Sequence, residues 1–208
     1  MNNIDLKAMT RLSYGLFVLS AREGDKDNGC IVNVVNQVTD SPLQIVVTVN
    51  KKNLTHDMIL HTGRFNVSML TEQAPLKVFE IFGYQSGRDA DKFANCGVEA
   101  RTANGILRLP KYINAYISAE VQQTVDLGSH TMFIAKVTEA AQVNSDPSLT
   151  YAYYQANIKP KPAATAEPDK TKWVCKVCGY VHEGEELPED FVCPWCKHGA
   201  SDFEKVEK

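Results

Sequence analysis

The chain carries two short cysteine pairs near its C-terminus, Cys175-Lys-Val-Cys178 and Cys193-Pro-Trp-Cys196, separated by fourteen residues. Two intervening residues let the chain turn so that both thiolates of a pair point to one side. Two such turns that face each other place four thiolates at the corners of a tetrahedron, which suits zinc or iron. The sequence therefore predicts a small metal-binding module at residues 172–208, with these four cysteines as the ligands.

On spacing alone, two interpretations of this module stay open. A zinc ion in four cysteines would staple a segment that is too short to build its own hydrophobic core. An iron ion in the same ligands would carry electrons, with properties tuned by the groups around it. Gly179 follows the first pair where the loop must tighten, and Trp195 and Phe203 supply aromatic cover.

Composition limits the function of the rest of the chain. The 208 residues are 44% hydrophobic and 23% charged, which predicts one ordinary globular domain beside the small module. A net charge of −3 gives no basic surface for nucleic acid or an anionic membrane. The apolar stretch at residues 12–21 is too short and too interrupted for a signal or a membrane span. Paired cysteines without an export signal indicate a reducing, cytoplasmic location.

A change in composition marks the boundary between two domains. Residues 158–171 contain three prolines and, after the first residue, no large apolar side chain. A proline-rich linker of this length extends about 40 Å, at roughly 3.1 Å per residue, and is semi-rigid. We expect a domain at residues 1–157, this linker, and the metal module at residues 172–208.

The sequence predicts that the large domain is mainly β. Runs rich in β-branched and aromatic residues alternate with turn residues, whereas helical periodicity is confined to residues 55–61 and 75–82. Many strands with few helices favour an antiparallel barrel or sandwich over alternating βαβ units. The predicted strands are residues 15–20, 30–39, 43–50, 65–70, 112–125 and 131–143.

Two polar segments interrupt this apolar pattern. In the first, Asn33 and Gln37 lie within an otherwise apolar run, which also fits ordinary edge-strand polarity. In the second, Lys51, Asn53 and Thr55 end a strand and open a helix, where unpaired N–H groups and the helix dipole favour a phosphate. The chain has no Gly-x-Gly-x-x-Gly motif and no Walker motif, so a Rossmann or P-loop domain is not expected.

Taken together, these segments resemble a known family. The order Gln37-Val-Thr-Asp-Ser-Pro42, Gly63-Arg-Phe-Asn-Val-Ser68 and Phe82-Gly-Tyr-Gln-Ser-Gly-Arg-Asp-Ala-Asp-Lys-Phe93 is similar to the flavin reductase family of FMN-binding split β-barrels with Greek-key topology. The resemblance covers nearly all of residues 1–154. It implies a homodimer that binds FMN and oxidises NAD(P)H. The FMN-binding residues that it implies are Ile31, Asn33, Val34 and Gln37 along the ring and ribityl chain, Lys51, Asn53 and Thr55 at the phosphate, and His130 near the flavin or nicotinamide.

The cysteine module resembles a second family. Its match to rubredoxin domains runs through Trp173-Val-Cys-Lys-Val-Cys-Gly-Tyr180 and Cys193-Pro-Trp-Cys-Lys-His198. This resemblance implies one iron ion in four cysteinates. Lys197 and His198 after the last cysteine resemble the variant found in rubrerythrins.

The whole chain resembles the high-molecular-weight rubredoxins, which join these two domains. That resemblance implies transfer of electrons from NAD(P)H through FMN to iron and on to a protein acceptor such as a flavodiiron protein. Two alternatives stay open. The chain could be a flavin reductase that releases reduced FMN and carries a structural zinc ribbon, or a non-enzymatic FMN-binding adaptor.

Overall fold

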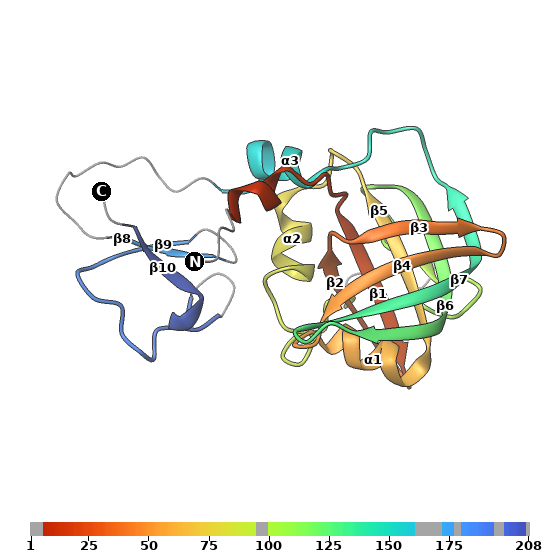
Figure 1. The fold of residues 1–208 in the computed structure, drawn as a ribbon, viewed down its shortest axis with the longest axis horizontal. Coiled ribbons are helices and arrows are strands. Elements are labelled where there is room, and N and C mark those ends of the chain that lie inside the picture. Colours follow the sequence, from red (N-terminus) through yellow and green to blue (C-terminus); the bar gives the residue numbers. More distant parts are fainter. Residues whose placement is uncertain (1–5, 95–99, 161–171, 177–179, 194–197, 207–208) are drawn as a thin grey trace.

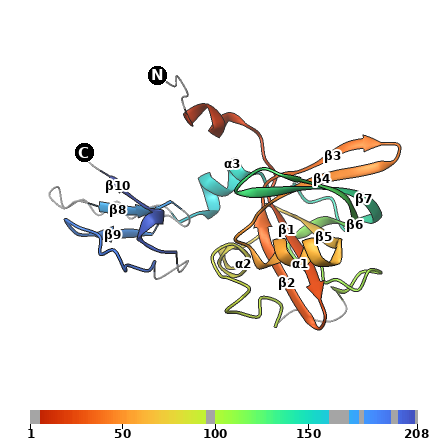
Figure 2. The ribbon, with the colours of Figure 1, turned by 60° about the horizontal axis from the view of Figure 1, so that its bottom comes forward.

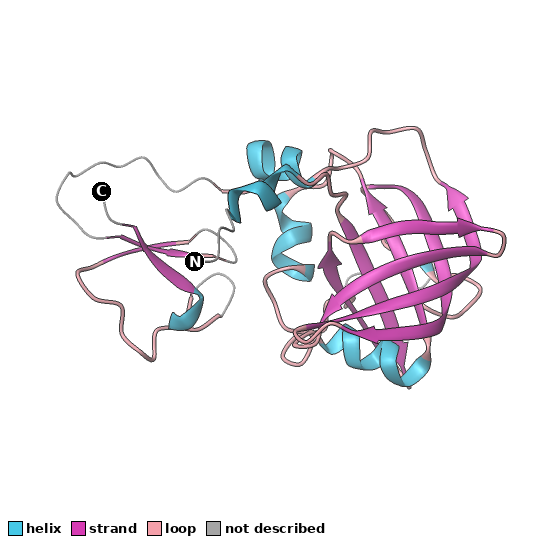
Figure 3. Ribbon diagram, viewed as in Figure 1, coloured by secondary structure: helices cyan, strands magenta, loops and turns pink. Residues whose placement is uncertain are grey.

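The computed structural model of the chain describes residues 6–94, 100–160, 172–176, 180–193 and 198–206. Strands dominate, as predicted (Figure 3). The large sheet has seven strands: β1 (Phe17–Glu23), β2 (Lys26–Val32), β3 (Val35–Asp40), β4 (Leu43–Asn50), β5 (Arg64–Leu70), β6 (Ile113–Asp126) and β7 (His130–Gln142). The helical segments before the linker are η1 (Leu6–Arg11), α1 (Leu54–Thr62), α2 (Leu76–Phe82), α3 (Tyr151–Tyr153) and η3 (Tyr154–Ile158).

The large sheet is antiparallel and curls into a barrel (Figure 1). Its strand order is β2-β1-β5-β6-β7-β4-β3, so β2 and β3 are the two edges although they follow each other in the chain. Only Asn33 and Val34 separate these edges. A two-residue step cannot span an open sheet of seven strands, since strands lie about 4.8 Å apart. The covalent chain thus brings the two edges together and leaves a seam at this step.

The barrel interior is filled by alternate residues of its strands. Along β4, Ile45, Val47 and Val49 are buried while their neighbours are partly exposed, and Phe133 and Ala135 repeat this alternation on β7. A period of two places every second side chain on the same face of a strand. The alternation that the sequence shows is therefore the alternation between core and surface.

Helix α1 closes one end of the barrel (Figures 1 and 2). Its buried side chains, Thr55, His56, Met58 and Ile59, face the barrel core. The helix ends at Gly63, whose φ of 67° lies in the left-handed region and whose N–H binds the carbonyl of Ile59. Glycine adopts that conformation without a steric penalty, so α1 stops cleanly before β5 begins at Arg64.

Two of the sequence predictions need correction. The predicted strand at residues 30–39 is two strands, because the chain leaves one edge of the sheet at Val32 and joins the other at Val35. The helical segment Tyr151–Ile158 was not predicted. Its second half is a π-helix, which is a rare form that is often found at functional sites. The other predicted strands and both predicted helices lie within two or three residues of the observed ones.

The C-terminal module forms a separate sheet of three strands in the order β10-β8-β9. These strands are β8 (Lys172–Cys175), β9 (Val181–Glu183) and β10 (Phe203–Val206), preceded by the 3-10 turn η4 (Ala200–Asp202). Most of the predicted linker, residues 161–171, lies outside the described residues. Within the described parts of the chain, no helix combines the length and the apolar character that a membrane crossing requires.

Candidate functional site

A groove of about 310 Å³ lies at the seam of the barrel. This edge groove has walls from the end of β2, the two-residue step, β4, the start of α1 and the β6–β7 turn. Ligand sites have typical volumes of about 300 Å³ or more, so the edge groove can admit part of a cofactor. The residues that line it are Ile31, Val32, Asn33, Val34, Thr48, Asn50, Asn53, Leu127 and His130.

Five of the eight predicted FMN-binding residues line this groove, namely Ile31, Asn33, Val34, Asn53 and His130. They come from three segments that are far apart in the sequence. The step that joins the sheet edges makes one backbone hydrogen bond within the described part of the chain, from Thr48 N–H to Val34 O at 3.2 Å. Backbone groups outside regular ladders are the ones that a ligand can contact.

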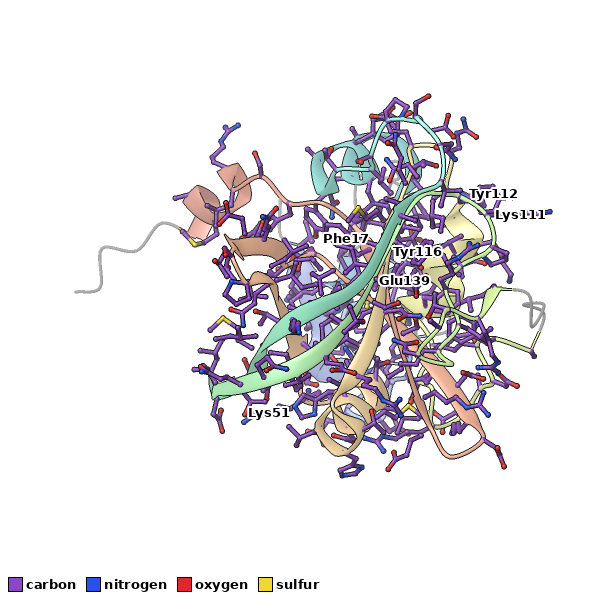
Figure 4. All side chains as sticks on the ribbon, turned by 90° about the vertical axis from the view of Figure 1, so that its right-hand side faces the viewer. Phe17, Lys51, Lys111, Tyr112, Tyr116 and Glu139 are labelled. Atoms are coloured by element: carbon purple, nitrogen blue, oxygen red, sulfur yellow. The ribbon has the colours of Figure 1, made fainter. Side chains whose placement is uncertain are left out.

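Lys51 is not among the lining residues, but it follows Asn50, which is one of them. Its backbone N–H binds Ser129 O at 3.1 Å, and its Nζ is 2.7 Å from Asp126 Oδ1. Figure 4 shows Lys51 near the tip of the β6–β7 hairpin, far from Lys111 and Tyr112 at the start of β6. The Lys51 ammonium and the N–H of Gly128 hold the pKa of the Asp126 carboxyl below its usual range. The Lys51 ammonium group could bind an anion, but in this structure it is paired with the Asp126 carboxylate.

Asn53 and Thr55 differ in what they can offer to a ligand. Asn53 is the N-cap residue of α1, yet its side chain makes no capping hydrogen bond and lines the groove instead. Thr55 is fully buried, and its Oγ1 accepts a 3.0 Å hydrogen bond from Asn28 Nδ2. Any contact between Thr55 and a phosphate would therefore be made by its backbone N–H rather than its hydroxyl.

Gln37 lies away from the groove. It is exposed on β3, and its Nε2 contacts Thr39 O at 3.5 Å. Strand β3 is an edge of the sheet, and all of its residues are exposed or partly exposed. In a single chain this side chain does not reach the residues that line the groove.

A second hollow, of about 200 Å³, adjoins the edge groove, because Ile31 and Asn53 line both. Five of its twelve lining residues are aromatic, so we call it the aromatic hollow. The rings of Phe79 and Tyr154 lie 4.3 Å apart, and the hydroxyls of Tyr84 and Tyr154 are 2.5 Å apart. The residues that line it are Leu16, Cys30, Ile31, Asn53, Phe79, Phe82, Gly83, Tyr84, Tyr151, Tyr154, Gln155 and Lys159.

Sequence reasoning missed the part that Tyr151 and Tyr154 play in this wall. Three tyrosines in four residues, Tyr151-Ala-Tyr-Tyr154, were a usable signal, because aromatic clusters at a domain boundary seldom face solvent. In the sequence these tyrosines mark only the end of the family resemblance, at residue 154. The aromatic wall thus leads directly into the predicted linker, which starts at residue 158.

A larger hollow of about 660 Å³ contains none of the predicted site residues. Its walls are mainly charged, and Arg101 binds Asp27 through two hydrogen bonds of 2.9 and 2.7 Å. Paired charges of this kind do not offer the apolar surface that a planar aromatic ring requires. The edge groove, although smaller, has the better chemistry for a cofactor.

The structure describes two of the four predicted metal ligands. Cys175 and Cys193 are both buried, whereas Cys178 and Cys196 lie outside the described residues. The N–H of Cys175 binds the carbonyl of Tyr180 at 2.8 Å, and the N–H of Cys193 binds the carbonyl of His198 at the same distance. The first cysteine of each pair thus binds the carbonyl five residues ahead, so the two cysteine segments share one backbone contact.

Aromatic rings cover this part of the module. Phe191 contacts Phe203 edge-on with ring centroids 5.3 Å apart, and His182 lies 4.5 Å from Phe191. Thiolate ligands beneath an aromatic cover suit a single tetrahedral ion. The described residues are therefore consistent with a site held by Cys175, Cys178, Cys193 and Cys196.

A closed antiparallel barrel with a groove at its seam, followed by a small cysteine-rich sheet, defines a class of two-domain redox proteins. The model of the flavin reductase like domain matches residues 9–161, and the model of the rubrerythrin, rubredoxin-like domain matches residues 173–204. The chain belongs to the flavin reductase-like family and carries a rubredoxin-like domain at its C-terminal end.

Individual relatives support this assignment. A high-molecular-weight rubredoxin from Moorella thermoacetica is 37% identical over 230 residues, covering 98% of this chain and 100% of the relative. A ferric-chelate reductase (NAD(P)H) from Archaeoglobus fulgidus is 34% identical over 164 residues, covering 78% and 96%. The solved styrene monooxygenase flavin reductase from Pseudomonas putida S12 superposes with a TM-score of 0.57 and 28% identity, covering 69% of this chain and 88% of that one.

Proposed function

We propose that this chain is an NAD(P)H-dependent oxidoreductase that passes electrons from NAD(P)H through FMN to an iron ion held by Cys175, Cys178, Cys193 and Cys196. A redox partner, such as a flavodiiron protein, would then accept the electrons. FMN when bound takes up two electrons as hydride and releases them singly, and a tetracysteinate iron takes up one at a time. The protein joins the two centres in one chain.

The observation that carries this proposal is the presence of both sites in one polypeptide. The edge groove gathers five predicted FMN-binding residues, and in the module beyond the linker Cys175 and Cys193 are buried and make matching backbone hydrogen bonds. The relative from Moorella thermoacetica, named a high-molecular-weight rubredoxin, aligns over both domains. The named NAD(P)H-dependent relative from Archaeoglobus fulgidus supports NAD(P)H as the donor.

The roles of the protein groups follow from their positions. Ile31, Asn33 and Val34 would contact the ring and ribityl chain from the step between the sheet edges. Lys51, Asn53 and the N-terminal amides of α1 would bind the phosphate, since the charge of Lys51 and the helix dipole both favour an anion. His130, whose Nδ1 is 2.8 Å from Ser129 Oγ, would lie beside the cofactor at the opposite wall.

The domain division belongs to this proposal. Residues 1–157 would carry the flavin chemistry, residues 158–171 would serve as the tether, and residues 172–208 would carry the iron. Two copies would form a cytoplasmic homodimer, in which the exposed Gln37 on the edge strand β3 would reach the flavin site of the partner. A short tether gives the two domains a high effective concentration for each other. Their contact can therefore be weak and still occur often enough for electron transfer.

Anaerobic spectroscopy of the native protein tests the proposal. We expect iron rather than zinc in protein from its natural source, and flavin absorbance that bleaches before the iron absorbance when NAD(P)H is added. Only the first step should depend on NAD(P)H concentration. Zinc alone in the native protein, or iron that stays oxidised over many flavin turnovers, would contradict the relay and favour a reductase that releases reduced FMN.

A further inference from the structure

One apolar cluster contains buried residues from both domains. Phe79 and Tyr154, which line the aromatic hollow, belong to it, and so do Cys175, Cys193 and Phe203 of the metal module. The barrel core forms a second cluster, and none of its described members comes from the module. The module is therefore joined to the large domain on the side of the aromatic hollow rather than at the barrel core.

The arrangement of the elements agrees with this contact. In two views of the ribbon, the module lies on the side of the barrel that carries α2 and α3, away from the β3–β4 turn (Figures 1 and 2). Ile158, at the end of the π-helix, and Trp173, on β8, both pack against the shared cluster. The chain thus leaves this cluster at the start of the linker and returns to it at the start of the module.

The mouth of the aromatic hollow offers apolar surface and one cation. Tyr151 is 39% exposed, and Gln155 and Lys159 are partly exposed beside it. Tyrosine is enriched at the centre of protein interfaces, because its ring is apolar while its hydroxyl can still form a hydrogen bond. The Lys159 ammonium group has no carboxylate partner among the residues that the structure describes, so it is available to a partner surface.

The module carries a matching acidic surface. Leu187 packs against the shared cluster and lies within the loop that follows β9. Exposed carboxylates flank it on both sides. A positive group on one surface and negative groups on the other favour docking in one orientation. The exposed carboxylates of this loop are Glu185, Glu186, Glu189 and Asp190.

We propose that the aromatic hollow and residues 151–159 form the docking surface for the metal module of the same chain. The linker permits this contact, since the chain from Lys159 to Lys172 can extend about 40 Å at roughly 3.1 Å per residue. Covalent attachment makes docking an intramolecular event, so a modest surface is sufficient. The apolar cluster supplies the contact, and the charges of Lys159 and the acidic loop orient it.

Docking at this place brings the metal close to the flavin site. The inference rests on the proposed function for its purpose, since FMN would occupy the edge groove, which shares Ile31 and Asn53 with the aromatic hollow. At each of two contacts one electron passes from reduced flavin to ferric iron, and the flavin proton returns to water. Because electron transfer slows steeply with distance, a module docked at the hollow can accept these electrons, whereas one at the β3–β4 turn cannot.

Tryptophan fluorescence tests the docking directly. Both tryptophans of the chain, Trp173 and Trp195, belong to the module, so their emission reports on the module alone. The measurement is the decay of tryptophan anisotropy in the full-length protein loaded with zinc, which four thiolates also accept and which carries no electrons. We expect wild type to decay with the tumbling of the whole protein, and to show little of the several-fold faster component that a free module gives.

Charge reversals on the two surfaces should weaken this docking. Lys159→Glu should weaken it about tenfold and enlarge the fast component, because like charges across a contact repel each other. Glu185→Lys with Glu186→Lys should act in the same way, and combining the reversals on both surfaces should restore docking. Lys136→Glu is the matched control, since Lys136 is exposed and lies opposite Gln44 in the sheet, beside the β3–β4 turn.

The other outcomes are equally decisive. A dominant fast component in wild type would mean that the module does not dock, and a slow decay that no charge reversal alters would place the contact elsewhere. Either result overturns the inference. Docking that is lost on dilution would overturn it too, because the occupant would then be the module of a second copy. Iron that NAD(P)H and FMN leave oxidised, in a protein whose zinc form docks, would contradict the proposed function while the docking surface stands.

Discussion

Lys51 and Asp126 form an ion pair, which the proposed contact between Lys51 and the FMN phosphate would have to replace. Their atoms are 2.7 Å apart on an exposed surface, where such pairs contribute little to stability. A phosphate would compete with the carboxylate for the same ammonium group. Breaking the ion pair to bind a phosphate would therefore cost little free energy.

We expect Lys51→Ala to weaken FMN binding about tenfold, since a charge-assisted contact contributes roughly 1.5 to 3 kcal/mol and this one is partly exposed to solvent. Fluorescence titration measures the change. Asp126→Asn should strengthen binding, because it removes the competing carboxylate. Lys52→Ala, an exposed neighbour, is the control. Equal effects of the two lysine substitutions would indicate general electrostatics rather than a phosphate contact at Lys51.

Asp57 gives the protein an acid-sensitive contact. Its carboxylate accepts hydrogen bonds from His56 Nδ1 at 2.9 Å and from Arg88 Nη2 at 2.6 Å, which together lower its pKa, His56 being the larger influence. Because a carboxylate can only accept, His56 donates from Nδ1 and faces the hydroxyl of Thr131 with Nε2, at 2.9 Å. This row ties α1 to the strand that carries His130.

The sign of the pH effect follows from that lowered pKa. The stabilisation is fully present above the unfolded carboxyl pKa of about 3.9 and is lost as pH falls through the lower folded value. We expect Asp57→Asn to reduce the urea midpoint at pH 7 and to reduce the further loss between pH 4 and pH 3. A variant that keeps the wild-type pH profile would show that other carboxylates dominate acid unfolding.

At the scale of elements, the loop after α2 is fixed to β2 through a glycine. A Cβ atom on Gly87 would lie 2.1 Å from Asn28 Oδ1, and the Asn28 side chain is buried and held by Thr55. No rotamer change can relieve that contact without breaking the Asn28 hydrogen bond. The close approach requires glycine at residue 87.

We expect Gly87→Ala to destabilise the protein by roughly 1 to 3 kcal/mol, the range typical of overpacking, as measured by urea denaturation. Combining it with Asn28→Ala should give less than the sum of the single losses, because the clash is removed. Gly199→Ala is a useful control, since its Cβ would meet nothing within 4 Å. Additive losses would mean that residue 87 contacts Asn28 only incidentally.

Elements were predicted well where one local pattern decides them and less well where the whole sheet does. Strand β4 could be placed at residues 43–50 because alternation and turn residues are local signals. The break at Asn33-Val34 could not, since it depends on β2 and β3 being opposite edges, and that order is fixed by pairing with distant strands. Five of the residues that the family resemblance predicted for FMN nevertheless lie together in one groove, and their contact with FMN stays a prediction.

At the scale of the molecule, the two sites should be separable. The structure places Tyr154 in the aromatic wall and continues the π-helix to Ile158, so a truncation after Pro160 keeps the large domain whole. We expect that fragment to oxidise NAD(P)H when FMN is supplied, and to lose delivery of electrons to a one-electron protein acceptor. The measurements are NAD(P)H consumption and acceptor reduction under anaerobic conditions.

A second truncation serves as the control. Cutting after Tyr153 removes Tyr154 and its contacts with Phe79 and Tyr84, so FMN-dependent activity should fall as well. If both fragments behaved alike, the wall would be dispensable. If the fragment ending at Pro160 still reduced the protein acceptor at the wild-type rate, the cysteine module would not carry the electrons.

For the metal module, the sequence predicts the ligands but not the identity of the metal. Four cysteines at this spacing predict the ligands without any fold, because the metal imposes the geometry. Spacing does not decide between zinc and iron, since both accept four thiolates. The edge groove is the opposite case, because its lining comes from segments as distant as Ile31 and His130 and exists only once the barrel has formed.

The seam of the barrel also constrains the order in which a newly made chain can fold. Strands β1, β2 and β5 form one block and β3 with β4 another, and only the β6–β7 hairpin joins β5 to β4. All five earlier strands are synthesised before that hairpin exists. The edges of β5 and β4 that pair with the hairpin therefore remain unpaired during that part of translation. Such edges invite association with other chains. The hairpin is thus the closing piece, and a ribosome-bound chain that ends before residue 113 should depend on a chaperone.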